Sequence, residues 1–238
     1  MKKVSLLMGC VFCTMMLFGQ ENGTKKAEKK EKKQQFAPVL FKDRIVLDFF
    51  SSVWSGLDTG IKQKPINFGF NGAIMFDLPV KKNSPVSFGL GVGVTNHNLY
   101  SNALWGIGEE YSTLITPLPD GWKYRKNKIT FTNINIPFEF RYRHSSGFKI
   151  MAGVRVGLMA DIHSKYFGPA LDGSEDKDLL KNYKIPNRTK IPVEFTFKTG
   201  WKFVSLNFSY MVTKMFTKDS PNNPQINTMS FGITLCPY

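Results

Sequence analysis

Charged side chains recur inside segments that otherwise alternate between apolar and small polar residues. The polar side of this alternation includes Asp48, Glu139, Arg141, Arg155 and Glu194. Acids and bases on one face of a wall can pair and fill an enclosed space, or they can line a narrow ion path. We favour a structural charge network, because a narrow barrel leaves little free bore for conduction.

A second constellation consists of His97, Asp161 and His163, with Ser101 and Ser164 nearby. Histidine beside a hydroxyl could act as a general base for a nucleophile, and the alternation places the first three on the polar side near the long connections. An enzyme at a barrel rim is therefore a third hypothesis. The chain has no nucleophile motif and no clustered Cys/His spacing, so we expect no catalytic residue, no cofactor and no metal.

The elements that would position these residues begin at residue 44. From there the chain repeats runs of period-two hydrophobicity, which is the period of strands with two different faces. The eight runs span 44–54, 66–78, 86–95, 133–143, 148–162, 191–198, 204–213 and 226–235. The connections alternate between short (79–85, 144–147, 199–202) and long (55–65, 96–132, 163–190, 217–225). This pattern predicts an all-β fold, an eight-stranded antiparallel up-and-down transmembrane β-barrel.

The alternation alone does not say which face points outward, since a soluble barrel or a β-sandwich has the same period. The polar faces are rich in Gly, Asn, Ser and Thr and carry isolated charges of both signs. Small residues with paired charges suit the interior of a narrow barrel, and an aromatic-rich apolar face suits contact with lipid. We therefore expect the apolar face to point outward.

The N-terminal region indicates export. Lys2 and Lys3 precede an apolar stretch, 6–18, that is too short to span a bilayer, so residues 1–20 are interpreted as a signal peptide. A lipoprotein-like box ending at Cys10 is interpreted as unused. Residues 21–43 form a charged periplasmic linker, and 44–238 form the barrel. The net charge of +14 is spread along the chain, and an exported protein gives no reason to expect a nucleic-acid partner.

The run INIPFEFRYR at 134–143 is followed by a tight turn, Gly147-Phe148, Ala152-Gly153 and Gly157. This hairpin resembles the central hairpin of PorT-like outer-membrane β-barrel proteins, and the resemblance covers 44–238. It implies an eight-stranded barrel in the outer membrane of a diderm bacterium. Members of the family often lack a defined activity, and the namesake is linked to protein secretion.

The long connection 101–127 is too apolar for an idle surface loop. We predict that it folds over the barrel mouth as a lid or contacts a protein partner through Trp105, Tyr111 and Trp122. The connection 163–190 mixes charges of both signs without the spacing of a calcium-binding loop, so we expect a solvated loop there.

Together these features predict a small outer-membrane protein with a structural, adhesion or assembly role and a lumen filled by side chains. A porin-like narrow channel for small solutes or ions is the alternative, and a lipid-modifying enzyme at the rim is a distant one. The expected partners are outer-membrane lipid and a protein that contacts loop 101–127. We expect a monomer.

Overall fold

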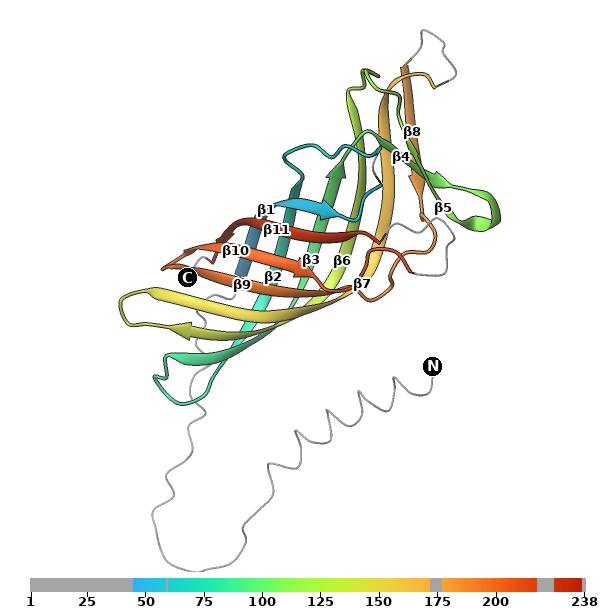
Figure 1. Cartoon of the computed structure of the whole chain (residues 1–238). Helices are drawn as coiled ribbons and strands as arrows, with labels where there is room; N and C mark the ends of the chain where they lie inside the picture. The colour runs from blue at the N-terminus through green and yellow to red at the C-terminus, as the bar shows by residue number, and fades with distance from the viewer. Residues whose placement is uncertain (1–44, 59, 172–176, 218–224, 237–238) are drawn as a thin grey trace, which may run out of the picture. The chain divides into compact units, whose positions relative to one another are not determined.

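Eight antiparallel strands close into a barrel in the computed structural model (Figure 1). Each strand pairs with its neighbour around the wall, and β11 returns to pair with β1, so the order is β1-β2-β3-β6-β7-β9-β10-β11. The predicted eight-stranded up-and-down barrel is confirmed. Its strands are β1 (Ile45–Ser55), β2 (Phe68–Pro79), β3 (Val86–Tyr100), β6 (Lys126–Arg143), β7 (Phe148–Pro169), β9 (Val193–Trp201), β10 (Val204–Met211) and β11 (Asn227–Leu235).

The structure describes residues 45–58, 60–171, 177–217 and 225–236. The predicted signal peptide, 1–20, and the predicted linker, 21–43, lie outside the described residues. Within the described ranges, no helix combines the length and the apolar character that crossing a membrane requires.

The connections separate by length, as predicted, to the two ends of the barrel (Figure 1). The three tight turns, β2–β3, β6–β7 and β9–β10, gather at one end. Each contains a residue in the left-handed conformation, namely Asn83, Gly147 and Lys202, which lets the chain reverse within a few residues. We call this the turn end and the opposite one the outer end.

Additional strands occupy the outer end. A hairpin of β4 (Ala103–Ile107) and β5 (Thr113–Pro117) encloses one 3₁₀ turn, Glu109–Tyr111, and β8 (Lys177–Tyr183) pairs with the outer part of β7. Strands β6 and β7 also extend further toward the outer end of the barrel than predicted. We call β8 with the outer parts of β6 and β7 the extension.

The prediction of a solvated loop over 163–190 is therefore wrong for much of its length, and the predicted connection 96–132 contains the ends of β3 and β6 as well as the β4–β5 hairpin. The alternation used to find strands requires an apolar outward face. At Lys126, Lys128 and Lys165 the outward face is charged although the ladder continues. A strand wall that has left the bilayer needs polar residues on its outer side, so the membrane pattern ends before the strand does.

The wall has its apolar side outward over the span of the barrel. Ile45, Phe49 and Val53 are exposed along β1, whereas Asp48 and Ser52 on the same strand are buried. The same alternation appears on β3, where Phe88, Leu90, Val92 and Val94 face out. The predicted orientation is confirmed, since an exposed belt of large apolar side chains is stable only against lipid.

A β-bulge changes the phase of β7. Asn133 of β6 pairs with Met159, whereas Thr132 pairs with Asp161, so Ala160 is the extra residue. One extra residue exchanges the two faces of the strand beyond it. The prediction that Asp161 and His163 face the lumen is therefore wrong, because both lie on the outward side while Ile162 and Ser164 are buried inside.

An apolar cluster fills the barrel at its outer end, and we call it the apolar cap. It contains Trp54, Ile61, Leu99, Ala103, Trp105, Ile129, Phe131, Met159, Ile162, Ile185, Met211, Met215, Phe216 and Ile226. Trp105 of the hairpin stacks on Phe216 at 5.9 Å between ring centroids, and Trp54 meets Phe131 edge to face at 5.3 Å. Barrel strands, the hairpin and the loops between strands thus share one core.

Candidate functional site

The lumen beneath the apolar cap holds a network of buried charges, which we call the ion network. Its centre is Arg155 on β7, whose Nη1 donates a hydrogen bond to Glu194 Oε2 at 3.0 Å and whose Nη2 donates to Asp48 Oδ2 at 3.1 Å. Asp48 also accepts from Asn71 Nδ2 at 2.8 Å and Thr234 Oγ1 at 2.6 Å. One guanidinium therefore joins carboxylates from β1 and β9 across the barrel.

A second group of charges lies nearer the turn end. Arg141 donates through Nε and Nη2 to Glu139 Oε2, at 2.9 and 2.8 Å. Asp77 on β2 accepts from Arg143 Nη1 at 2.8 Å and from Ser87 Oγ at 2.8 Å. The Arg141 side chain is fully buried, so its charge depends on these partners rather than on water.

Lys198 links the two groups. Its Nζ donates to Glu139 Oε1 at 3.0 Å and lies 3.4 Å from Asp48 Oδ1. The five charged residues singled out from the sequence thus lie in one connected network, together with Lys198, Asp77 and Arg143. The sequence carries a signal for these additional members, since Asp77 and Lys198 also occupy the polar phase of their strands. The sequence contains no comparable signal for which acid meets which base.

Small residues on the neighbouring strand make room for this network. Glycines alternate along the inward side of β3, and a Cβ at Gly89 would lie 2.5 Å from Nε of Arg141. The large guanidinium therefore occupies the space that a side chain on β3 would take. Such filling agrees with the width of an eight-stranded barrel, whose interior is just wide enough for side chains.

His97 is part of the ion network and lies between a serine and a carboxylate, as the histidine of a hydrolase catalytic triad does. Its Nδ1 lies 3.4 Å from Ser52 Oγ, and its Nε2 lies 3.0 Å from Glu194 Oε1. A serine, a histidine and a carboxylate that are hydrogen-bonded in this order form a catalytic triad when the serine is accessible to substrate. Here all three side chains are buried, and the His97 ring stacks on Phe131 of the apolar cap at 4.7 Å.

The other residues of the rim-enzyme hypothesis lie apart from His97. His163 Nδ1 is 2.6 Å from Asp161 Oδ2 on the outer side of β7, with Asp161 partly exposed. Ser164 Oγ donates to the carbonyl of Trp105 at 2.7 Å, and Ser101 is buried. The structure therefore does not bring these five residues into one site. Among the described residues, no group of three His, Cys, Asp or Glu side chains is placed to hold a metal ion.

The three aromatic residues of loop 101–127 occupy different positions. Trp105 is buried in the apolar cap. Trp122 donates from Nε1 to the Tyr166 hydroxyl at 2.9 Å, which ties the loop to the inner side of β7. Tyr111 lies at the tip of the hairpin and is 62% exposed. Trp105 and Trp122 therefore hold the loop in place, and Tyr111 is presented outward.

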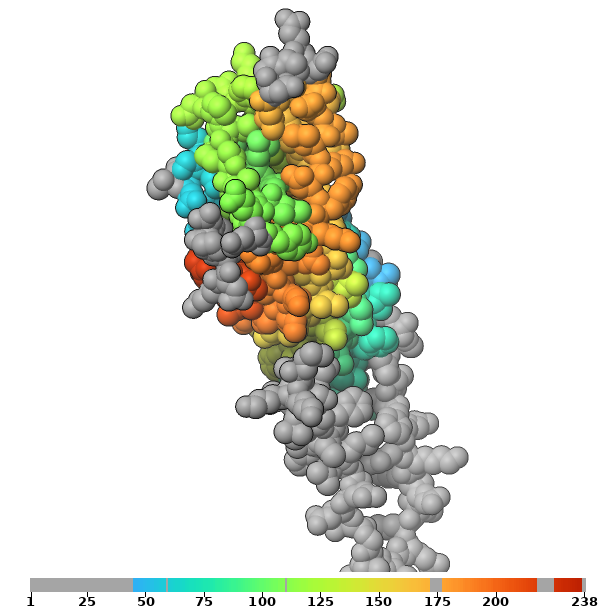
Figure 2. All heavy atoms as spheres, turned by 90° about the vertical axis from the view of Figure 1, so that its right-hand side faces the viewer, coloured from blue at the N-terminus to red at the C-terminus, as the bar shows by residue number. Residues whose placement is uncertain are grey.

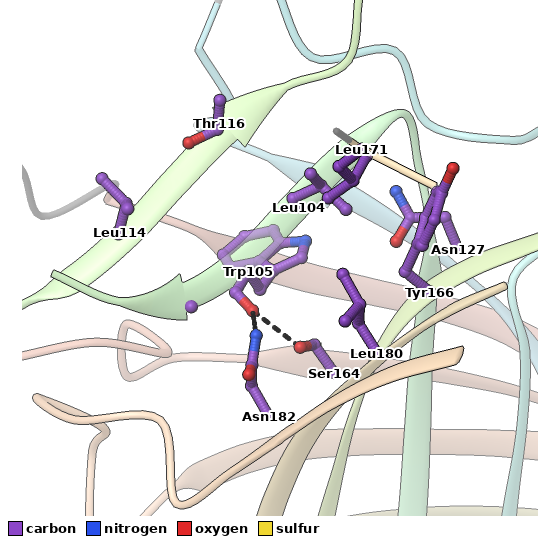
Figure 3. A pocket seen from close by; sticks show the side chains of 11 residues that line it. Leu104, Trp105, Leu114, Thr116, Asn127, Ser164, Tyr166, Leu171, Leu180 and Asn182 are labelled. Atoms are coloured by element: carbon purple, nitrogen blue, oxygen red, sulfur yellow. Dashed lines mark hydrogen bonds between the residues drawn. The ribbon is translucent and has the colours of Figure 1, made fainter. Parts of the chain in front are cut away.

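Side chains of the extension hold the hairpin by its β4 edge. Asn182 Nδ2 and Ser164 Oγ both donate to the Trp105 carbonyl (Figure 3). Asn127 Nδ2 donates to the Ala103 carbonyl at 2.9 Å. Beside this edge is a cavity of about 200 Å³. Its apolar lining includes Leu104, Leu114, Leu171 and Leu180. Edge carbonyls of β4 are thus satisfied by side chains, which keeps the hairpin docked.

An exposed ion pair fastens two further connections at the outer end. Lys62 Nζ donates to Asp120 Oδ1 at 2.8 Å, and this hydrogen bond and the positive charge hold the pKa of the Asp120 carboxyl below its ordinary value. Lys62 belongs to the β1–β2 connection and Asp120 to the segment after β5. Because both side chains are exposed, the pair contributes little to stability.

The chain was compared with protein families, curated proteins and solved structures. A family model described as an outer membrane protein beta-barrel domain matches residues 47–235. Among solved structures, the chain is similar to Ail, the attachment invasion locus protein of Yersinia pestis, in a complex with the heparin analogue sucrose octasulfate. The identity is 10%, the match covers 80% of this chain and 95% of that chain, and the TM-score is 0.34. No curated protein matches the chain.

Proposed function

Because the chain belongs to the family of outer membrane protein beta-barrel domains, we propose that it is a closed barrel with a structural, adhesion or assembly role in the cell outer membrane. The barrel would hold the folded outer end at a fixed place above the bilayer. The observation that carries this proposal is the filled interior, in which the ion network is covered by the apolar cap.

The filled interior also weighs against the porin-like alternative. A permeating ion would have to displace charges that already pair with one another, such as Arg155 with Asp48 and Glu194. It would then meet the apolar cap, where a desolvated ion has no polar partner. A conducting barrel instead needs a continuous wet path.

Conductance of the purified protein in planar bilayers tests the closed-barrel proposal. We expect no steady conductance from the wild type and none from Lys62→Ala, whose ion pair is exposed. Arg141→Ala removes a fully buried cation and serves as the sensitised variant. Steady wild-type conductance that Arg141→Ala abolishes or enlarges would establish a channel and overturn the proposal.

The tip of the β4–β5 hairpin supports a role in contact. Three large apolar residues, Ile107, Tyr111 and Leu114, are exposed there, whereas Trp105 and Trp122 anchor the hairpin to the extension. Exposed apolar residues on a well-anchored hairpin are typical of a binding surface. We infer that the tip contacts a protein partner outside the cell.

Photo-crosslinking on intact cells tests the contact. A photoreactive residue at Tyr111 should yield a discrete crosslinked species, and the same residue at Lys82, in the β2–β3 turn at the opposite end, should not yield that species. The tip variant Ile107→Ser with Leu114→Ser should reduce the yield. The contact would be refuted if position 111 gave the same products as position 82.

Three finer assignments belong to the same proposal. Membership of the PorT-like group is supported by the run at 134–143, which places Glu139 and Arg141 in the lumen. A non-enzymatic role is supported by the burial of Ser52 and His97. We also propose that the barrel acts as a monomer, since its eight strands pair fully with one another.

A further inference from the structure

The outward side of the extension is a regular array of side chains. Strands β6, β7 and β8 pair in register there, and three successive rows across them are Lys126–Phe167–Leu179, Lys128–Lys165–Lys181 and Thr130–His163–Tyr183. The middle row thus places three lysines directly opposite one another. Figure 2 shows β8 in orange along one side of the outer end, next to the green β4–β5 hairpin. We call the outward side of these rows the basic face.

Three lysines in one cross-strand row repel one another. Like charges directly opposite in a sheet are destabilising, and side chains there are about 5 Å apart at Cβ. A surface that only needs to be soluble usually mixes charges of both signs. The three rows contain no carboxylate, and Asp161, the next outward position on β7, already lies against His163. An arrangement that costs stability in isolation becomes favourable when an anion sits on it.

Shallow cavities whose lining includes the Phe167 ring adjoin the lysine row. One, of about 450 Å³, is lined by Arg125, Lys126, Lys165, Phe167 and Leu179. The Arg125 guanidinium lies over the Phe167 ring, 5.4 Å from its centroid. Cations around a partly exposed ring suit a ligand that combines sugar rings with phosphate groups, because the aromatic ring packs against the sugar while the cations bind the phosphates.

The position of the basic face favours a lipid headgroup as the source of that ligand. On β6 the outward side passes continuously from Ile134 and Ile136, which face lipid, to Lys128 and Lys126. Lys128 lies six positions along the strand from Ile134, which is about 20 Å along a strand or about 15 Å along the membrane normal at a typical tilt. Phospholipid headgroups occupy only about 5–8 Å of that distance. A saccharide headgroup is large enough to reach the lysines.

We propose that the basic face binds the phosphate groups of saccharide headgroups carried by glycolipids of the outer leaflet that surrounds the barrel. The bound headgroups neutralise the Lys128–Lys165–Lys181 row and fix the extension relative to the membrane surface. This inference rests on the outer-membrane location of the family and not on the closed lumen or on the hairpin contact, so its failure would leave both of those standing.

Binding of purified lipopolysaccharide to the full-length protein in detergent tests the proposal. The test variant is Lys165→Gln with Lys181→Gln, which leaves Lys128 and its hydrogen bond to Asn98 intact. The matched control is Lys81→Gln with Lys82→Gln, which removes two exposed lysines from the β2–β3 turn. Heat-modifiable migration on a gel verifies that each variant has closed its barrel. The ligand arms are intact lipopolysaccharide, the same lipid with its phosphates removed, and a soluble sulfated polysaccharide.

We expect intact lipopolysaccharide to bind the wild type and the control equally, and to bind the test variant about tenfold more weakly. Removing the phosphates should weaken wild-type binding to a similar degree, and added salt should reduce it further. Equal affinity of the test variant and the control would overturn the proposal. So would equal affinity for the dephosphorylated lipid, or binding of the sulfated polysaccharide without binding of lipopolysaccharide, which would point to an external polyanion instead.

Discussion

The ion network and the apolar cap lie in the same barrel, but the polarity of the inward and outward faces is reversed between them. Around the ion network the inward side is charged, as at Arg155, and the outward side is apolar, as at Val154. At the level of the apolar cap the inward side is apolar, as at Ile162, and the outward side carries His163 and Lys165. The difference follows from the medium outside the wall, which is lipid at one level and water at the other.

The β-bulge at Ala160 lies where β7 changes from an apolar outward face to an apolar inward face. Below it, Leu158 faces lipid; above it, Ile162 faces the cap. A regular strand would have placed both on the same side, since they are four residues apart. The bulge exchanges the two faces of β7 at the level where the medium outside the wall changes, whereas β6 makes the same transition through its residue types alone, with Asn133 and Phe131 both inward.

Breaking the ion network at its centre should produce the largest effect. Arg155→Met leaves Asp48 and Glu194 buried beside an apolar side chain, and loss of one partner of a buried ion pair costs about 3–5 kcal/mol. The free energy of unfolding, measured by urea titration of the barrel in lipid vesicles, checks this. Lys62→Met, which breaks the exposed pair with Asp120, should leave the free energy of unfolding almost unchanged, because water screens both charges.

A compensated variant distinguishes lost pairing from lost packing. Adding Asp48→Asn and Glu194→Gln to Arg155→Met removes the two buried carboxylates that the single variant deprives of their guanidinium partner, so much of the lost stability should return. If the triple variant were less stable than Arg155→Met alone, the carboxylates would not be the source of the cost. A loss under about 1 kcal/mol in the single variant would contradict the described pairing.

A smaller and more local effect is expected from the apolar cap. Ile162→Ala removes a fully buried side chain, which costs about 2–4 kcal/mol. Because the cap joins the hairpin and loops to the barrel, the loss should appear as faster hydrogen exchange in β4 and β8 with the membrane part of the barrel still closed. Leu158→Ala changes a lipid-facing residue and should leave exchange in these strands unaltered. Equal effects of the two variants would mean that the phase of β7 does not change at Ala160.

The sequence predicted the barrel well because lipid enforces a strict alternation. All eight barrel strands, the outward apolar face and the segregation of short turns follow from period-two hydrophobicity and connection lengths alone. The alternation also identified side chains such as Arg155 and Glu194 as inward. It could not assign pairs, because partners such as Asp48 and Arg155 are 107 residues apart and meet only when the barrel closes.

The outer end was harder to predict for the same physical reason. Above the bilayer, neither face of a strand is obliged to be apolar, so period-two hydrophobicity does not mark the outer parts of β6 and β7 or any of β8 as strands. The bulge at Ala160 reversed the predicted faces of Asp161 and His163, since nothing in the sequence marks an extra residue within an otherwise regular ladder. The apolar character of loop 101–127 distinguishes it from a solvated loop, but it carries no signal for the β4–β5 hairpin.

The smallest expected effect is on the stability of the extension, whose outward side carries the basic face where the membrane level of the wall carries apolar residues. In a chain without bound glycolipid, Lys165→Gln with Lys181→Gln relieves the repulsion along the lysine row. The stability of the β7–β8 pairing should then rise by up to about 1 kcal/mol at low salt, and the gain should shrink as salt screens the charges. Hydrogen exchange in β8 measures this, with Lys81→Gln and Lys82→Gln as the control that should change nothing. A fall in stability would mean that the lysines are held by favourable contacts within the protein itself. A rise, combined with weaker binding of lipopolysaccharide, would show that the row trades stability of the extension for affinity toward an anion.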